Sequence, residues 1–487
     1  MQKVCSKRKK EKDGIIMLGN PAGVTATHLK QVAEAKRFLE RWTADEDFRK
    51  LVAKDVRASR KECGIATDPE EIKALWDRET ALEVNKRNAV PLPVKRYREF
   101  IKEKLAHRDI LRNVSCVPDN PVFKVWRARQ VNRCWGQFGN VNASMIHAPV
   151  SFELDRGCSV GCWFCGLDAQ KLSAVYEYTP KNAKLWRETL SVFKKLAGAA
   201  AGTGVCYWAT EPMDNPDYEK FCCDFHEILG TFPQTTTALP LKDPDRTRRL
   251  LKLSNERGFW INRFSVLSLG MLHKIHKEFT AEELAYVELV TQNKEANMKQ
   301  AASGRARIKM QNDGDIDVNA EFDPAAGGSG TISCMSGFLV NMIDRNVKLI
   351  SPCNSNNKWP LGYWLHAEGN FTGAASLEKL LREMVDKCMP TTVNHADAMR
   401  FRPDLKFELI DSGFNVTSPF ITLKFHSMPH IGEIGEMINS GKFTAGDIAV
   451  TIADKYDVQV AEVFMVLNKI FRHGVIDEEP ETKKFGR

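Results

Sequence analysis

The residues with the clearest chemistry are three cysteines in one short segment, Cys158, Cys162 and Cys165. Thiolate sulfurs are good ligands for zinc and for iron–sulfur clusters. A structural zinc site takes four ligands, usually as two separated pairs, and no second pair lies nearby. A cubane cluster held by three cysteines leaves one iron free to bind another molecule. The pattern therefore predicts an iron–sulfur site; the alternative is three buried cysteines that happen to be close.

The surroundings of these cysteines favour a metal-binding loop. They follow a predicted strand, Val150–Leu154, and therefore occupy a strand-to-helix connection. Gly157 and Gly161 allow the backbone to fold tightly around a bound group. The other ten cysteines are scattered along the chain and form no comparable cluster.

Length and composition indicate a multidomain protein of the cytoplasm. The chain has 487 residues, which is long for one domain. Its apolar runs are too short for a membrane span, and its polar, basic N-terminus does not resemble a secretory signal. We therefore expect a cytoplasmic protein with reduced cysteines rather than a disulfide framework.

The net charge of +8 is a modest excess. Two short basic runs, Lys7–Lys10 and Arg246–Arg249, stand out. Solvated surface faces explain this charge best, so we expect no nucleic-acid partner. An acidic peptide partner also fits, and composition does not choose between these explanations.

The elements that must position the cysteines alternate between strand and helix patterns after residue 148. Short apolar stretches predict strands, and the segments Lys181–Lys195 and Asp243–Asn255 have helical composition. Such alternation predicts βαβ units around a parallel sheet, open or curved into a partial barrel. The predicted strands are Val150–Leu154, Val205–Ala209, Thr235–Leu239, Trp260–Val266 and Val287–Thr291.

The flanking regions differ from this pattern. Residues 25–80 have helical periodicity, and several prolines interrupt residues 85–148. Two apolar stretches around Asp344-Arg345-Asn346 predict a hairpin, and 441–476 predicts two helices. We expect four regions: a helical domain at 1–148, the strand–helix domain at 149–335, a hairpin and capping region at 336–415, and a mainly helical region at 416–487.

The cysteine segment, with Phe164 before its last cysteine, resembles the hallmark loop of the radical S-adenosylmethionine enzymes. The resemblance implies an α/β fold with a partial (β/α)6 barrel at 149–335. It also implies a [4Fe-4S] cluster that binds S-adenosylmethionine and reduces it to a 5′-deoxyadenosyl radical. Barrel active sites lie at the carboxyl ends of the strands, where the cluster is expected.

The same resemblance implies residues that hold the cosubstrate. Glu211, in Ala209-Thr210-Glu211-Pro212, stands where the family has a Gly-Gly-Glu-like element that binds the amino group. The glycines are missing here, and a surface glutamate is the alternative. Further candidates for the carboxylate, ribose and adenine are Arg263, Ser265, Ser268, Gln292 and Asn293.

Residues 150–365 also resemble the radical S-adenosylmethionine peptide epimerases of proteusin-type pathways, which invert L-residues of a ribosomally made precursor peptide. The Gly-rich segment 327–341 and the stretch from Leu349 to Tyr363 carry this resemblance. Inversion requires a hydrogen atom delivered opposite to the deoxyadenosyl radical, and a thiol S–H bond is weak enough to supply it. Cys334, or failing that Cys353, is the predicted donor; burial as a small apolar residue is the alternative for either.

The two ends of the chain point to the same class of substrate. Segment 25–80 resembles the leaders of nitrile-hydratase-like precursors, although a plain helical cap explains it equally well. Segment 443–476 is similar to the small winged-helix modules that bind such leaders, and core packing is its alternative. The implied partners are a precursor peptide and an electron donor for the cluster. The rival functions are another peptide maturase, forming thioethers or C-methyl groups, and a non-catalytic metal-binding peptide chaperone.

Overall fold

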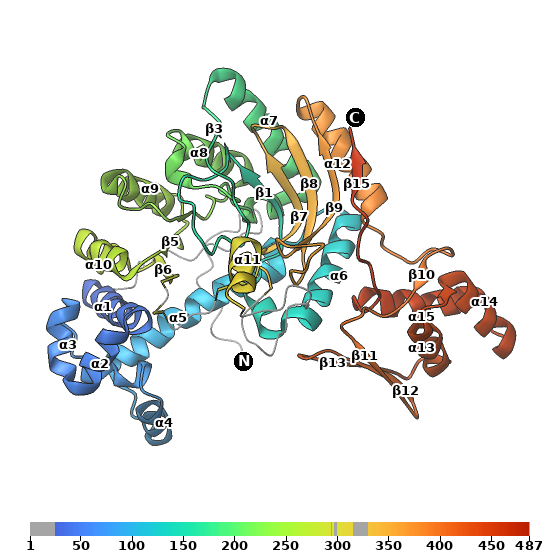
Figure 1. The fold of residues 1–487 in the computed structure, drawn as a ribbon, viewed down its shortest axis with the longest axis horizontal. Coiled ribbons are helices and arrows are strands. Elements are labelled where there is room, and N and C mark those ends of the chain that lie inside the picture. The colour runs from blue at the N-terminus through green and yellow to red at the C-terminus, as the bar shows by residue number, and fades with distance from the viewer. Residues whose placement is uncertain (1–24, 294, 297–299, 315–329, 487) are drawn as a thin grey trace.

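The structure is a computed structural model that describes residues 25–293, 295–296, 300–314 and 330–486. It is a mixed α/β protein, with helices on the N-terminal side, a central sheet and a second helical group at the C-terminal side (Figure 1). Part of the Gly-rich segment, residues 327–329, lies outside the described residues. None of the helices in the described ranges is both long and apolar enough to cross a membrane.

Helices make up residues 26–144, as expected for this part of the chain. Side chains cap the first three of them: Thr25 accepts from the backbone N–H of His28, Asp45 from that of Phe48, and Asp55 from that of Ala58. The prolines at 93 and 121 were expected to break structure, but they stand in the first turns of α5 and α6, where proline is well tolerated. The bounds are α1 (Ala26–Ala44), α2 (Glu46–Lys54), α3 (Val56–Cys63), η1 (Pro69–Leu75), α4 (Arg78–Arg87), α5 (Leu92–Ile110), η2 (Leu111–Ser115), α6 (Pro121–Phe138) and η3 (Gly139–Ser144).

The central sheet has the strand order β1-β7-β8-β9-β15. Strand β1 is parallel to β7, and β7, β8 and β9 are antiparallel neighbours. The predicted hairpin around Arg345 is confirmed, with Asn341 opposite Asn346. Because β7 pairs with β1, however, the hairpin extends the main sheet, and the expected boundary after residue 335 falls inside β7. The bounds are β1 (Ala148–Glu153), β7 (Met335–Asn341), β8 (Asn346–Pro352), β9 (Tyr363–Asn370) and β15 (Lys483–Phe485).

A second, three-stranded sheet is parallel and has the order β4-β5-β6. The strand predicted at Val205–Ala209 does not form: this segment runs between the two sheets and makes only isolated bridges, from Val205 to Gln234 and from Tyr207 to Glu153. The described residues thus form two sheets joined by bridges, and the partial barrel stays a prediction. The bounds are β4 (Thr236–Thr237), β5 (Arg263–Val266), β6 (Glu288–Thr291), and the two-stranded β2 (Asp155–Arg156) and β3 (Ala174–Val175).

Helices alternate with these strands, and the two predicted at 181–195 and 243–255 are confirmed as α7 and α9. One face of the central sheet packs against α6, α7, α8 and α12. The ring of Phe152 on β1 meets that of Trp186 on α7 at a centroid distance of 4.8 Å, edge to face. Each such buried aromatic contributes ~1.5–3 kcal/mol to stability. The bounds are α7 (Pro180–Ala197), η4 (Gly198–Thr203), η5 (Pro212–Asp214), α8 (Tyr218–Leu229), α9 (Pro244–Glu256), α10 (Leu269–Glu278), α11 (Gly304–Asn312) and α12 (Ala374–Cys388).

The C-terminal region combines helices with a small sheet. The two helices predicted within 441–476 are confirmed as α14 and α15, but the three-stranded antiparallel sheet β11-β12-β13 was not expected. The expected boundary at residue 416 falls inside β12. The bounds are β10 (Ala398–Met399), β11 (Lys406–Ile410), β12 (Gly413–Thr417), β13 (Thr422–His426), α13 (Ile431–Ser440), β14 (Phe443–Thr444), α14 (Ala445–Tyr456) and α15 (Val460–Arg472).

Candidate active site

The cysteine loop begins after the carboxyl end of β1, and its two ends meet where Cys158 lies beside Gln170 and Lys171. The backbone N–H of Cys158 donates to the carbonyl of Gln170 over 2.8 Å, which closes the loop. Gly157 has a φ of +87°, and a Cβ there would lie 2.5 Å from the carbonyl oxygen of Lys171. Glycine is therefore required at this position. All three cysteines are partly buried.

Backbone N–H groups interact with two of the thiols. Ala169 donates to the sulfur of Cys165 over 3.3 Å, and the backbone N–H groups of Val160 and Gly161 act to lower the pKa of Cys158. Burial raises the pKa of Cys158, and burial together with the two neighbouring cysteines raises the pKa of Cys162 to about 12. Hydrogen bonds to sulfur are a feature that tunes iron–sulfur sites.

The chemistry of this donor set fits an iron–sulfur cluster, but the thiols do not form a ready-made metal site. Among the described residues, no three His, Cys, Asp or Glu side chains are arranged to hold a metal ion. Cluster binding would require the thiols to lose their protons and to converge, as metal sites often do only on loading.

Arg305, at the start of α11, forms several hydrogen bonds with the cysteine loop. Its guanidinium donates to the carbonyl of Cys162 over 3.0 Å, to Asp168 over 2.9 Å and to the carbonyl of Ala169. Its backbone N–H also donates to the carbonyl of Cys165 over 2.9 Å. Sequence reasoning missed Arg305, because nothing in the sequence links it to a loop so far away.

Gly304 allows this close approach. Its φ is +54°, and a Cβ there would lie 2.5 Å from the carbonyl oxygen of Cys165. Helix α11 continues over the loop, where the ammonium of Lys309 lies 5.8 Å from the ring centroid of Trp163. The ring of Phe164, expected near the cosubstrate, meets Trp163 edge to face at 5.4 Å.

Glu211 is buried, with 3% of its surface exposed, so the alternative of a surface glutamate is wrong. Its carboxylate accepts hydrogen bonds from the backbone of Ala238 over 2.8 Å and of Met213 over 3.1 Å, and from the Thr237 hydroxyl. Burial raises its pKa, and its charge in turn raises the pKa of Cys158 and Cys162. Glu211 therefore lies within electrostatic reach of the cysteine loop.

Ala209, two residues earlier, has a φ of +51°. The left-handed region is natural for glycine and costs an alanine about 1 kcal/mol. The backbone thus makes a glycine-type turn before Glu211, although the sequence has no glycine there.

The remaining cosubstrate candidates fall at two ends of the second sheet. Ser268 follows the carboxyl end of β5, where its hydroxyl caps α10 by accepting from Met271 over 3.2 Å. Gln292 follows the end of the neighbouring β6. Arg263 instead begins β5 and pairs with Glu288 over 2.8 Å. Ser265 lies in β5, between Arg263 and Ser268. Asn293 donates to the carbonyl of Ala44 over 2.8 Å.

The two candidate hydrogen donors have different surroundings. Cys353 is 2% exposed and packs against Trp359 and Trp364, as a structural cysteine would. Cys334 is partly exposed at the start of β7. Burial raises its pKa, and Arg263 opposes this shift.

The cysteine loop reaches back toward Cys334. Leu167 packs on the apolar cluster that includes Ala148 and Met335, and a Cβ on Gly166 would lie 3.0 Å from the side chain of Ile332. These contacts place the loop against the residues on both sides of Cys334. Cys334 thus lies in a segment that contacts the cysteine loop, whereas Cys353 lies in a small cluster with Trp359 and Trp364.

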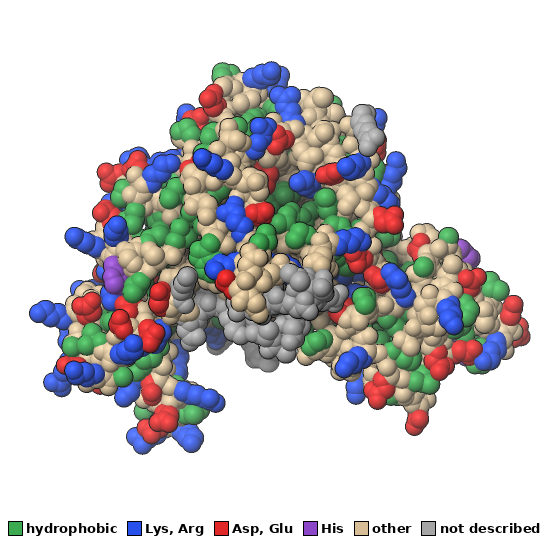
Figure 2. Space-filling view, viewed as in Figure 1, with side chains coloured by type: hydrophobic (Ala, Val, Ile, Leu, Met, Phe, Trp, Pro, Cys, Tyr) green, Lys and Arg blue, Asp and Glu red, His purple; other side chains and the backbone are tan. Residues whose placement is uncertain are grey.

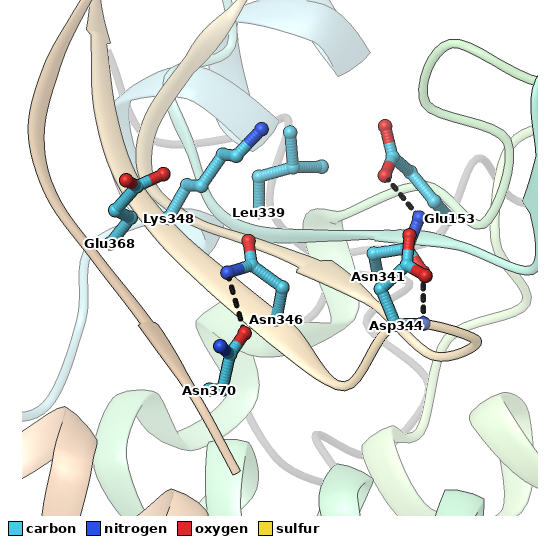
Figure 3. Close-up of a pocket in the computed structure, with 8 residues that line it drawn as sticks. All are labelled: Glu153, Leu339, Asn341, Asp344, Asn346, Lys348, Glu368 and Asn370. Atoms are coloured by element: carbon cyan, nitrogen blue, oxygen red, sulfur yellow. Dashed lines mark hydrogen bonds between the residues drawn. The ribbon is translucent and has the colours of Figure 1, made fainter. Parts of the chain in front are cut away.

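A cavity of about 300 Å³ opens on the face of the central sheet that the helices leave free (Figure 3). It lies where β1 ends and the cysteine loop begins. Figure 2 shows hydrophobic side chains gathered near the centre of the face in view, with charged side chains around them. Burial raises the pKa of Glu153 to about 7. Sequence reasoning identified none of the lining residues, Glu153, Leu339, Asn341, Asp344, Asn346, Lys348, Glu368 and Asn370.

Comparison with known proteins gives one strong match. The chain is 38% identical over 463 residues to the uncharacterized protein y4wI of Sinorhizobium fredii, covering 93% of this chain and 89% of that protein. No family model matches. Among solved structures, BtrN in complex with AdoMet and 2-DOIA matches 41% of this chain and 71% of its own, at 14% identity and a TM-score of 0.27. A likeness of this size does not establish a shared fold.

Proposed function

The chain belongs to the same family as y4wI of Sinorhizobium fredii, and we propose that it is a radical S-adenosylmethionine epimerase that converts L-residues of a peptide to D-residues. The observation that carries the proposal is the cysteine loop. Three thiols share one glycine-bent connection after β1, with backbone N–H groups interacting with two of the sulfurs. Glu211 supplies a buried carboxylate within reach of this loop.

A [4Fe-4S] cluster with S-adenosylmethionine, when bound, supplies a 5′-deoxyadenosyl radical. Cys158, Cys162 and Cys165 would hold the cluster, and Glu211 would accept hydrogen bonds from the cosubstrate's ammonium group. Arg305 keeps the backbone of the loop in place, so that the thiols stay on one side of the substrate.

Cys334 completes the reaction from the other side. The Cys334 thiol would give its hydrogen atom to a planar substrate Cα, on the face opposite to the one from which the original hydrogen was removed. The S–H bond breaks, the new C–H bond has the D configuration, and a thiyl radical remains. An external reductant must then supply one electron and one proton to restore the thiol. Pairing with a base is unnecessary, because an atom and not a proton moves.

The C-terminal sheet supports a peptide substrate. Within the described part of the chain, β11 and β13 each pair only with β12, so both outer edges of this sheet carry free backbone groups. A peptide can add to such an edge as a further strand. The helix α13 packs on the sheet and keeps it rigid. We propose that this module holds the leader of the precursor.

The test is anaerobic reconstitution followed by turnover of a candidate precursor peptide in deuterated water. The proposal expects an iron–sulfur absorption band, release of 5′-deoxyadenosine, and D-residues that each carry one deuterium at Cα. Loss of two hydrogens from the peptide would indicate thioether formation, and gain of a methyl group would indicate C-methylation. A protein that binds iron and peptide without releasing 5′-deoxyadenosine would be a chaperone.

A further inference from the structure

The cavity on the free face of the central sheet carries a row of polar side chains in exact strand register. Glu153 on β1 lies opposite Asn341 on β7, Asn341 lies opposite Asn346 on β8, and Asn346 lies opposite Asn370 on β9. Neighbouring strands are ~4.8 Å apart, so the four side chains form a continuous line across the sheet. Figure 3 shows them at the rim of the cavity.

Part of this row is already hydrogen-bonded. The amide nitrogen of Asn341 donates to Glu153 over 2.8 Å, and that of Asn346 donates to Asn370 over 3.0 Å. These bonds leave one oxygen of Glu153 and the amide nitrogen of Asn370 without a partner among the described residues. The row is therefore fixed in position and still has a free acceptor and a free donor.

Lys348 lies in the next row, opposite both Leu339 and Glu368. No described residue forms an ion pair or a hydrogen bond with its ammonium group. Figure 3 shows the side chain extended beside Leu339. An ammonium group at a cavity wall with no anion beside it is free to donate charge-assisted hydrogen bonds to a carboxylate that enters the cavity.

The other charged groups around the cavity are already paired. Asp344 accepts from Arg156 over 3.2 Å, and Glu368 lies 3.4 Å from Lys484. Glu153 has no cation within ion-pair distance among the described residues. When Glu153 is protonated, the charged residues around the cavity and their ion-pair partners carry one net positive charge, that of Lys348.

We propose that this cavity binds a carboxylate side chain of the peptide substrate, an Asp or a Glu. Lys348 and the side-chain amide of Asn370 would donate hydrogen bonds to the carboxylate. Leu339 would contact the methylene groups of the bound side chain, and the side-chain oxygen of Asn346 would accept from a peptide N–H. This inference rests on the proposed function for the peptide nature of the ligand. The carboxylate preference itself follows from the cavity.

Proton binding at Glu153 should tune the site. The groups that act on it are Lys348, which lowers its pKa, Asp344, which raises it, and Asn341, which hydrogen-bonds its charged form. Tyr363 lies close enough for Glu153 to raise the tyrosine's pKa. Because the pKa of Glu153 is about 7, its negative charge appears between pH 6 and pH 8 and weakens carboxylate binding.

The experiment is titration calorimetry of the purified full-length protein, without S-adenosylmethionine, against three probes. They are acetyl-Ala-Glu-Ala-amide, acetyl-Ala-Gln-Ala-amide and free glutarate. At pH 6 the Glu peptide should bind at least tenfold more tightly than the Gln peptide, and about threefold more tightly than at pH 8. Lys348→Met should abolish the preference, and Glu153→Gln should remove the pH dependence. Lys184→Met, an exposed lysine on α7, is the matched control.

Equal binding of the two peptides, an unchanged preference in Lys348→Met, or no binding of either peptide at millimolar concentration would overturn the inference. Glutarate that binds as tightly as the Glu peptide would overturn its peptide part and leave a site for free dicarboxylates. If Lys348→Met fails to fold, Asn370→Ala tests the same donor set, with an expected severalfold loss of the preference. The assay needs neither a cluster nor turnover, so failure of the proposed epimerase would not affect it.

Discussion

The guanidinium of Arg305 donates to the carbonyl of Cys162 over 3.0 Å, so helix α11 holds the backbone of the loop that carries the three cysteines. The two residues are far apart in sequence, and their contact joins the metal-binding segment to a helix that follows the second sheet. Most hydrogen bonds made by Arg305 go to backbone carbonyls. Unlike side chains, these carbonyls cannot rotate to find another partner if the arginine is lost.

Replacement of Arg305 by Lys should impair cluster loading. Lysine keeps the charge but cannot reproduce the fork that serves Cys162, Asp168 and Ala169 together. We expect the iron bound after anaerobic reconstitution to fall at least twofold, measured by iron analysis and by the electron paramagnetic resonance signal of the reduced cluster. Arg382→Lys, at an exposed ion pair on α12, should load like the wild type. Full loading of Arg305→Lys would contradict this positioning role.

Replacing each of the two candidate donor cysteines by alanine should affect activity and stability differently. Cys334→Ala should still release 5′-deoxyadenosine but form no D-residue, because only hydrogen return is lost. Cys353→Ala should stay active but lose about 1–2 kcal/mol of stability, since it leaves a gap beside Trp359 and Trp364. Chiral analysis of the peptide and denaturant unfolding measure these outcomes. An active Cys334→Ala with an inactive Cys353→Ala would reverse the assignment.

Ala209→Gly should be neutral or stabilising by up to about 1 kcal/mol, because glycine removes the steric cost of a φ of +51°. Ala106→Gly, at an exposed position inside α5, should instead destabilise by about 1 kcal/mol. Thermal unfolding of both variants tests the opposite signs. A clear loss of stability in Ala209→Gly would argue against the left-handed turn before Glu211.

Glu153 should make stability depend on pH. Its pKa is raised from 4.5 to about 7 in the folded protein, so the folded state binds a proton more tightly than the unfolded state. Between pH 4.5 and 7 the wild type therefore loses stability as pH rises, by an amount on the order of 2–3 kcal/mol. Glu153→Gln should lack this loss, so its stability relative to the wild type should increase from pH 5 to pH 8 in denaturant titrations. A difference that stays constant with pH would show that the pKa of Glu153 is not raised in the folded protein.

The features that sequence reasoning predicted were those with local signals. The helices α7 and α9 and the hairpin around Arg345 each follow from periodicity within a short window. Glu211 was singled out only through the resemblance to the radical S-adenosylmethionine enzymes, because it stands where that family has its Gly-Gly-Glu-like element. None of these predictions required knowledge of which strands pair.

The features that were missed depend on long-range pairing. The row from Glu153 to Asn370 exists only because β1, β7, β8 and β9 adopt one register, which no local pattern specifies. The sheet β11-β12-β13 was overlooked because its outer strands are largely exposed and lack a buried alternation. Prolines 93 and 121 misled because proline both breaks helices and opens them.

The most direct test of the central claim is chiral analysis of a precursor peptide after turnover by the anaerobically reconstituted protein in deuterated water. The account predicts D-residues, each with one deuterium at Cα, and none when Cys158, Cys162 or Cys165 is replaced by Ala. Unchanged L-residues from a protein that is loaded with iron and releases 5′-deoxyadenosine would contradict it.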